Sequence, residues 1–194
     1  VIMLSRPQFG SKIEDVKKQG VEVIIALDVS NSMLAEDIQP DRLVRAKQAI
    51  SRLVDNLDND KIGLIVFAGD AYTQIPITTD YVSAKMFLST ISPEMVPKQG
   101  TSIGAAISLG IRSFSPGEDK SKAMIIITDG ENHEDNPMTA AEEAAKAGIV
   151  IHTIGIGSSG GVPVPVISNE KKEYLKDASG NTVITKLDED ILKT

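Results

Sequence analysis

Four short, predominantly apolar runs rich in valine and isoleucine recur along this chain, and they constrain its fold more than any other feature. The runs are Val21–Leu27, Ile62–Phe67, Met124–Ile127 and Ile149–Ile154. They show little regular alternation with polar residues, which is typical of strands covered on both faces. His152 falls inside the last run, so we expect it to be a buried core residue rather than a catalytic one. The runs therefore predict a central sheet covered by helices on both sides.

Amphipathic segments separate these runs. Residues 41–57 place apolar side chains at steps of three and four, the spacing of one helix face. Similar segments at 81–91, 102–114 and 137–147 predict three further helices, and Gly148 marks the end of the last one. Because strands alternate with helices, we expect a doubly wound α/β fold with a mostly parallel sheet.

One strand is expected to run in the opposite direction. Only residues 68–71 separate the second apolar run from Tyr72–Ile75, too few for a crossover between parallel strands. Tyr72–Ile75 is therefore predicted to be a short antiparallel strand at one edge of the sheet. Farther along, Glu173–Leu175 and Thr182–Thr185 flank residues 177–181, a pattern typical of a hairpin.

The composition of the 194 residues excludes several classes of protein. Lys and Arg number 20 against 27 Asp and Glu, and the resulting net charge of −7 argues against a nucleic-acid-binding surface. The absence of cysteine excludes disulfide scaffolds, thiolate zinc sites and cysteine nucleophiles. With only two histidines, a catalytic zinc site built from protein side chains is not expected. No apolar run approaches the roughly 18 residues that a membrane helix requires.

We divide the chain into a lead-in (residues 1–20), a core (21–156) and a C-terminal extension (157–194). The apolar stub Val1–Leu4 is either the end of a removed membrane helix or a segment lying on the domain, and both interpretations remain open. The extension begins with glycine- and serine-rich residues 157–161, expected to be a flexible connection, and ends in residues that resemble the start of a helix.

Polar residues follow the apolar runs at the positions where ligands bind in α/β sheets. The stretch Asp28-x-Ser30-x-Ser32 places a carboxylate and two hydroxyls at alternate positions, which can face one point. Asp129 follows the third run, and Thr101 lies on a glycine-marked loop before a predicted helix. Five oxygen donors suit a hard dication, Mg²⁺, Mn²⁺ or Ca²⁺, rather than zinc or copper. Because two carboxylates neutralise a dication, the ion is expected to keep an open position that attracts an external carboxylate.

Other interpretations explain fewer of these residues. Asp28 could be an aspartyl nucleophile, but phosphatases of the haloacid dehalogenase type need a second carboxylate where Ser30 stands. The two serines could cap a helix, which would leave the other donors unexplained. The alternative function is a magnesium-dependent hydrolase that uses the same site. Such an enzyme needs a general base or nucleophile near the ion, and His133 is the only candidate.

Two further expectations concern the surroundings of the donors. Glu131 and His133 either form a rim that selects partners or belong to a solvated acidic loop. Asp28 and Asp129 should repel each other when no dication is present, so a dication should stabilise the fold. By the same reasoning, removal of Asp129 should leave the metal-free domain equally stable or slightly more stable.

The five oxygen donors resemble the metal-ion-dependent adhesion site of von Willebrand factor type A (VWA) domains. They match that motif in order and in predicted context, and the resemblance covers residues 21–156. It implies that the five donors surround one divalent ion. It also implies that an exposed Asp or Glu of a protein partner completes the coordination, so the domain would be an interaction module and not an enzyme.

Three longer stretches, residues 28–33, 61–69 and 127–133, resemble the Bacteroides aerotolerance proteins BatA and BatB, with BatB slightly closer. The sequence Ser5-Arg6-Pro7-Gln8 is similar to the point where that family leaves a membrane hairpin. This resemblance implies a membrane-anchored stress protein of the bacterial inner membrane with this domain in the periplasm. It also implies other Bat proteins, or a complex linked to a MoxR-type AAA+ ATPase, as partners.

Overall fold

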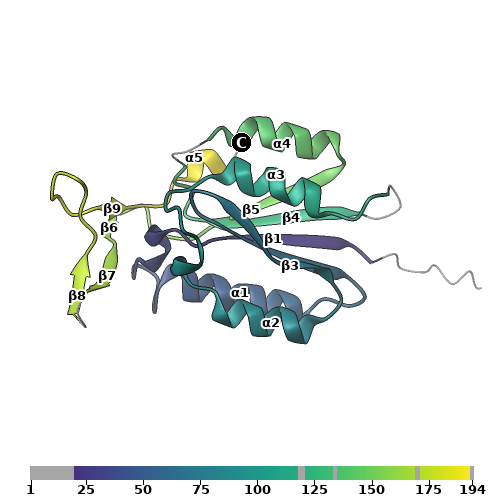
Figure 1. The fold of residues 1–194 in the computed structure, drawn as a ribbon, viewed down its shortest axis with the longest axis horizontal. Coiled ribbons are helices and arrows are strands. Elements are labelled where there is room, and N and C mark those ends of the chain that lie inside the picture. Colours follow the sequence, from purple (N-terminus) through teal and green to yellow (C-terminus); the bar gives the residue numbers. More distant parts are fainter. Residues whose placement is uncertain (1–19, 118–120, 133–134, 169–170, 193–194) are drawn as a thin grey trace, which may run out of the picture.

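The computed structural model describes residues 20–117, 121–132, 135–168 and 171–192. A five-stranded sheet with the order β3-β2-β1-β4-β5 lies between two layers of helices (Figure 1). Its strands are β1 (Glu22–Asp28), β2 (Lys61–Phe67), β3 (Ala71–Thr78), β4 (Lys122–Thr128) and β5 (Ile149–Gly155). Only the pairing of β3 with β2 is antiparallel, and the other neighbours in this sheet are parallel. The predicted α/β fold, with its mostly parallel sheet and one antiparallel edge strand, is confirmed.

Four helices cover the sheet: α1 (Arg42–Asp55), α2 (Tyr81–Thr90), α3 (Ile103–Ser113) and α4 (Pro137–Lys146). The first two lie on one face and the last two on the other (Figure 1). The loops and the extension add the short helices η1 (Asn31–Leu34), η2 (Pro93–Met95) and α5 (Glu189–Leu192). The side chain of Asp41 accepts a hydrogen bond from the Val44 N–H, which fixes the start of α1.

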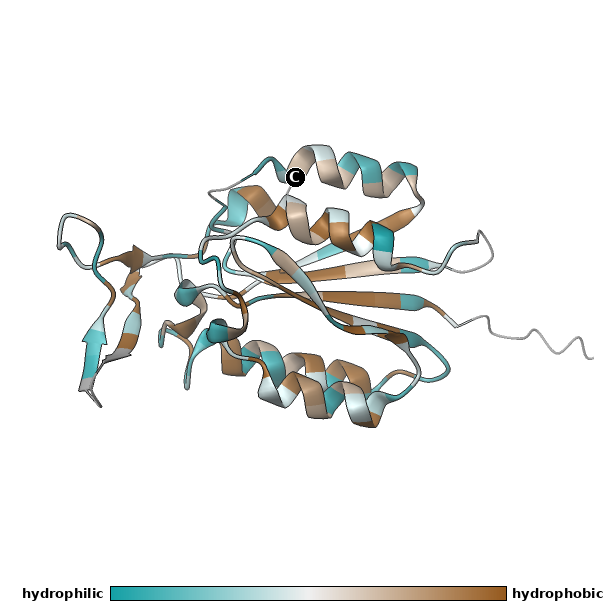
Figure 2. Cartoon of the chain, viewed as in Figure 1, coloured by the Kyte–Doolittle hydropathy of each residue, from teal (hydrophilic) through white to brown (hydrophobic). Residues whose placement is uncertain are grey.

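The core consists of two apolar layers, one on each face of the sheet. Successive residues of β1 alternate between them, with Ile25 and Leu27 facing α1 while Ile24 and Ala26 face α3. Figure 2 shows the apolar colour concentrated along the central strands. A strand that supplies both layers has apolar residues on both faces, as residues 23–27 of β1 do, which explains why its sequence does not alternate.

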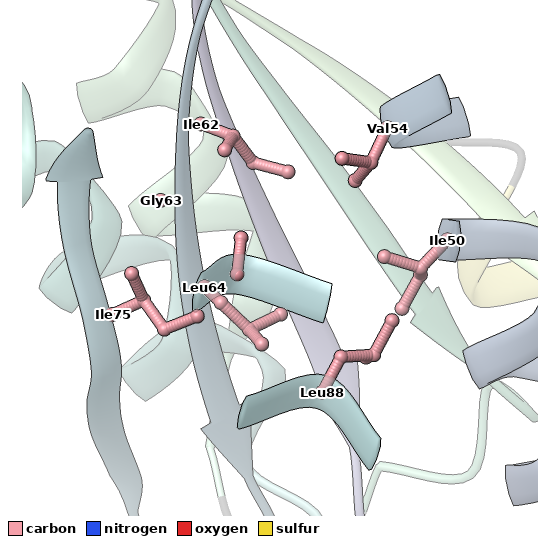
Figure 3. Close-up of a pocket in the computed structure, with 8 residues that line it drawn as sticks. Ile50, Val54, Ile62, Gly63, Leu64, Ile75 and Leu88 are labelled. Carbon is pink, nitrogen blue, oxygen red and sulfur yellow. The ribbon is translucent and has the colours of Figure 1, made fainter. Parts of the chain in front are cut away.

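A small cavity lies between β2, β3, α1 and α2 (Figure 3). Its volume is about 10 Å³ and its lining is apolar, with Ile50, Leu64 and Leu88 among the contributing side chains. A space of this size holds at most one water molecule, and an apolar lining offers it no hydrogen-bond partners. The cavity is therefore a packing gap in the core rather than a ligand site.

The last strand of the sheet, β5, differs from the prediction. Ile149 and Ile151 pack toward α3 and α4, but Val150 and Ile154, on the opposite face, are 56% and 43% exposed. His152 is exposed as well. The expectations of a strand buried on both faces and of a core histidine are therefore wrong. Periodicity does not reveal which strand lies at the edge, where no described helix covers the second face.

The extension forms two small sheets beyond the carboxyl ends of β1 and β4 (Figure 1). In these sheets β6 (Val162–Pro163) pairs with β9 (Ile184–Thr185), and β7 (Pro165–Ser168) pairs with β8 (Lys171–Tyr174). The turn predicted at residues 177–181 is present, because the Asp177 N–H donates to the Asn181 carbonyl at 2.9 Å. The flanking segments, however, pair mainly with β6 and β7 rather than with each other.

Predictions for residues 1–19 and for the end of the chain at 193–194 lie outside the described residues. Within the part of the chain that the structure describes, no helix has both the length and the apolar character needed to cross a membrane.

Candidate metal site

Asp28 and Asp129 lie at the carboxyl ends of two adjacent parallel strands. Asp28 is the last residue of β1 and Asp129 directly follows β4, and the register pairs Leu27 with Ile127. Both aspartates are fully buried. The Thr128 hydroxyl donates to Oδ2 of Asp28 at 2.6 Å, so the two strand ends are joined at this point.

The chain that leaves β1 places two hydroxyls beside Asp28. The Ser30 N–H donates to Oδ1 of Asp28 at 2.9 Å, and the hydroxyl oxygens of Ser30 and Ser32 are 2.9 Å apart. The Val29 N–H donates to the Phe67 carbonyl at 2.8 Å, which holds this segment against the end of β2. Both serines are buried. The Asp-x-Ser-x-Ser stretch therefore brings its carboxylate and its two hydroxyls close together.

Thr101 lies on the loop that joins η2 to α3, and it is buried as well. The side chain of Gln99 accepts a hydrogen bond from the Asn31 N–H at 3.2 Å, and the Ser102 N–H donates to the Ala68 carbonyl at 2.7 Å. The loop is thereby fastened both to η1 and to the end of β2. This places the third hydroxyl at the same end of the sheet as the other donors.

A carboxylate from a different loop caps α3. Asp135 accepts hydrogen bonds from the N–H groups of Gly104 and Ala105, at 3.1 and 2.8 Å, and from the Ser102 hydroxyl. An acidic group at a helix N-terminus satisfies free N–H groups and opposes the helix dipole. A β-carbon at position 104 would lie 2.8 Å from the Asp135 carboxylate, so a larger residue there would displace the cap. The cap joins the loop after β4 to the loop before α3, and each loop carries one of the five donors.

Arg42, the first residue of α1, has a role at this site that was not predicted from the sequence. Its guanidinium is fully buried, and Nη1 donates to Oδ2 of Asp129 at 3.0 Å. Nε and Nη2 donate to the two carboxylate oxygens of Asp37, both at 2.8 Å. An arginine in the first turn of an amphipathic helix is usually exposed, so the pattern of α1 did not show that this side chain points inward.

These contacts set the electrostatics of the site. Burial, and then the charge of Asp129, raise the pKa of Asp28 to about 7 even though hydrogen bonds from Thr128 and Ser30 oppose the shift. Burial alone would also raise the pKa of Asp37, but its hydrogen bonds to Arg42 and Ser158 outweigh burial and lower it to about 2. The expected repulsion between Asp28 and Asp129 is therefore present, and Arg42 offsets part of it.

The donor set fits a hard dication. It comprises two carboxylates and three hydroxyls, all of them oxygen donors and all buried. When ionised, Asp28, Asp37 and Asp129 carry three negative charges against the one positive charge of Arg42, and a dication would balance the remainder. Among the described residues no three His, Cys, Asp or Glu side chains form a ligand cluster, so ligation here would depend on hydroxyl oxygens.

Glu131 contacts the C-terminal extension. Its Oε1 accepts hydrogen bonds from the Thr185 hydroxyl and from the Lys186 N–H, both at 3.0 Å. A role for Glu131 in selecting a partner stays a prediction. His133 lies outside the described residues.

Comparison with known proteins identifies the family. The family model of the von Willebrand factor type A domain matches residues 22–189. The chain belongs to this family. A solved structure of BatB, a conserved hypothetical protein from Bacteroides thetaiotaomicron, is 57% identical to this VWA domain with a TM-score of 0.86. That match covers 90% of this chain and 84% of the BatB chain, and the expected resemblance is confirmed.

Two further relatives support this assignment. An aerotolerance-related membrane protein from Bacteroides fragilis is 53% identical to this VWA domain with a TM-score of 0.85, covering 89% of this chain and 85% of that one. An uncharacterized protein of Borreliella burgdorferi is 31% identical over 162 residues. The match covers 82% of this chain but 47% of the Borreliella protein, so the chain spans about half the length of that curated relative.

Proposed function

We propose that this VWA domain is a cation-dependent protein-interaction module of a membrane-anchored bacterial aerotolerance protein. In this proposal a divalent cation, Mg²⁺ or alternatively Mn²⁺ or Ca²⁺, is held by the five donors and binds an exposed Asp or Glu of a partner protein. The donors are Asp28, Ser30, Ser32, Thr101 and Asp129. The observation that carries the proposal is that five buried oxygen donors lie on three loops at the carboxyl-terminal end of the sheet, where hydrogen bonds hold Asp28 beside Ser30 and Thr128.

The residues around the donors hold them in place before any ligand arrives. Thr128 and the Ser30 N–H fix both oxygens of Asp28, and Asp135 fastens the loop that leads to Thr101. A bound cation would supply Lewis acidity toward an anionic ligand. Because the buried carboxylates already balance a dication, the ligand that this site favours is a single external carboxylate rather than a highly charged anion.

We further propose that the full-length protein resides in the bacterial inner membrane with this domain in the periplasm. The likeness to an aerotolerance-related membrane protein supports membrane association. Other Bat proteins, or a complex linked to a MoxR-type ATPase, are the partners that we propose. The net charge of −7 argues against a nucleic acid as the partner.

The magnesium-dependent hydrolase is the alternative use of the same donors, and no observation on the described side chains favours it. It would require His133 as the general base, because that residue was the only candidate in the sequence. Replacement of His133 by alanine would abolish activity in such an enzyme, whereas an interaction module would keep its cation affinity.

The test is a titration of Mn²⁺ into the domain by calorimetry, followed by retention of candidate Bat partners in Mg²⁺ and in EDTA. The Asp28→Asn variant should lose cation binding and partner retention. Asp58→Asn makes the same change at an exposed aspartate outside the site and should behave like the wild type. Free aspartate or glutamate side chains on a competing peptide should displace the partner. Equal retention in EDTA and in Mg²⁺ would overturn the proposal.

A further inference from the structure

The C-terminal extension meets the candidate metal site through a buried threonine. Thr185 lies on β9 and is 1% exposed. Its hydroxyl accepts a hydrogen bond from Nη1 of Arg42 at 3.0 Å, the same nitrogen that donates to Asp129. The Thr185 hydroxyl itself can donate a hydrogen bond to Oε1 of Glu131 at 3.0 Å or to Oδ2 of Asp129 at 3.4 Å. A side chain of the extension thus completes the contacts of the guanidinium that holds Asp129.

Backbone groups of the extension fasten it at the same place. The Asp188 N–H donates to the carbonyl of Asp129 at 2.9 Å. The Ser158 N–H donates to Oδ2 of Asp37 at 2.6 Å, the carboxylate that also binds Arg42. Leu187 and Ser158 are joined by a backbone hydrogen bond of 2.9 Å, so the beginning and the end of the extension lie together against the site.

The chain also passes close to the guanidinium itself. Gly157 has a φ of +142°, and a β-carbon there would lie 3.0 Å from Cζ of Arg42. Only glycine accommodates both the backbone conformation and this approach. The glycine-rich start of the extension, which the sequence suggested as a flexible connection, therefore allows the chain to cover Arg42.

We propose that Arg42 and Thr185 are positioning residues that orient Asp129, and that binding of the cation and docking of the extension stabilise each other. The proposal rests on the cation-binding function proposed above. It makes the C-terminal extension a part of the site.

The physical reason is the orientation of the Asp129 carboxylate. Arg42 engages Oδ2, and the Glu131 N–H donates to Oδ1 at 3.2 Å, so rotation of the group is restricted. Hydrogen-bonded partners that orient a ligating group are worth about 10- to 100-fold in metal affinity. Loss of the Thr185 hydroxyl would remove one of the two acceptors of Nη1 and so weaken the restraint that keeps this nitrogen beside Asp129.

Reciprocity follows from linkage. If docking of the extension raises the cation affinity by some factor, the cation must favour docking by the same factor. The sheet that carries Thr185 has strands of only two residues, β6 and β9, so its own hydrogen bonds contribute little. A pairing of two residues on each strand opens easily, so the position of Thr185 is sensitive to its contacts at the site.

The experiment uses three variants, each of which replaces a threonine. Thr185→Val removes the hydroxyl with little change of shape, and Thr185→Ser keeps it. Thr182→Val is the matched control, because Thr182 is an exposed residue of the extension whose backbone bridges to Lys176. Calorimetry measures the Mn²⁺ dissociation constant, and amide hydrogen exchange measures protection of residues 157–188 with and without Mn²⁺.

We expect Thr185→Val to raise the Mn²⁺ dissociation constant about 10-fold and Thr185→Ser to recover most of the affinity. Mn²⁺ should slow exchange of the extension in the wild type and in Thr182→Val, and the slowing should shrink in Thr185→Val. If Thr185 only stabilised the fold, the Thr185→Val substitution would change the exchange rates of the extension by the same factor with and without Mn²⁺. A fourth variant, Arg42→Lys, keeps the positive charge but loses the planar guanidinium, and it should act in the same direction as Thr185→Val.

Two outcomes would contradict the proposal in distinguishable ways. If the wild type binds Mn²⁺ and Thr185→Val binds it as tightly as Thr182→Val, the coupling is absent while the proposed cation-binding function stands. If the wild type itself shows no binding of Mn²⁺ or Mg²⁺, the proposed function fails and the coupling fails with it.

Discussion

Replacement of Arg42 by methionine tests the electrostatic argument most directly. Methionine fills a similar volume but removes the positive charge between Asp37 and Asp129, whose side chains are 4% and 0% exposed. Removing one member of a buried ion pair costs about 3–5 kcal/mol, because the remaining charge has neither water nor a partner. For a chain of this length each kcal/mol shifts the melting temperature by about 2–4 °C, so the Arg42→Met domain should melt about 6–20 °C lower in EDTA.

The assay is thermal and urea unfolding of the wild type, Arg42→Met and Arg45→Met. Arg45 lies on the exposed side of the same helix, so its variant should stay within about 0.5 kcal/mol of the wild type. A second change, Asp37→Asn, should return part of the loss in the Arg42→Met background, because it removes one of the two stranded charges. A saturating dication should also recover stability by balancing the remaining acids.

A stabilising role for the buried Arg42 charge would be refuted if Arg42→Met were as stable as Arg45→Met in EDTA. It would be equally contradicted if Asp37→Asn destabilised the wild type and the Arg42→Met variant by the same amount, because the two side chains would then act independently.

Five further predictions concern other parts of the domain. In EDTA the raised pKa of Asp28 should make stability fall as pH rises from about 4 to about 7, by up to about 1.4 kcal/mol per pH unit, and urea unfolding in saturating Mg²⁺ should lack this slope. The lowered pKa of Asp37 acts in a separate window, contributing stability above pH 4 that is lost as pH falls toward 2. Asp135→Ala should cost about 1–3 kcal/mol in urea unfolding, because the N–H groups at the start of α3 lose their acceptor. Ile50→Ala should cost about 2–5 kcal/mol in the same assay, because it enlarges a gap already present in the core. Thr101→Ala should weaken partner retention more than it weakens Mn²⁺ binding measured by calorimetry.

The sheet and its four covering helices could be predicted because each has a strong local signal. The apolar run beginning at Val21 marks β1, and the steps of three and four residues within 41–57 mark α1. The short spacing before Tyr72 was enough to predict the antiparallel direction of β3. Features that depend on distant neighbours were missed. The exposure of His152 follows from the edge position of β5, and no local pattern records that position.

The candidate donors were found because their residue types and spacing are visible in the sequence, whereas the groups that hold them were not. Arg42 comes from a helix whose pattern gives no sign of an inward charge, and Thr185 from a strand of two residues. The contact between Arg42 and Asp129 changes the expected effect of removing Asp129. Removal of Asp129 would relieve its repulsion with Asp28, but it would also take a partner from a buried guanidinium, so the metal-free domain is not expected to gain stability.

The pairing of β1 with β4 has a consequence for the order of folding. Their register joins Glu22 to Lys122 across about 100 residues, whereas β2 and β3 are joined by a tight turn. Closing a long loop costs more chain entropy than closing a short one, so we expect the ends of β1 and β4 to meet late. A cation that needs both aspartates would then act after the rate-limiting step, slowing unfolding while leaving the folding rate unchanged. Its concentration would determine the lifetime of the folded domain rather than the speed at which the domain forms.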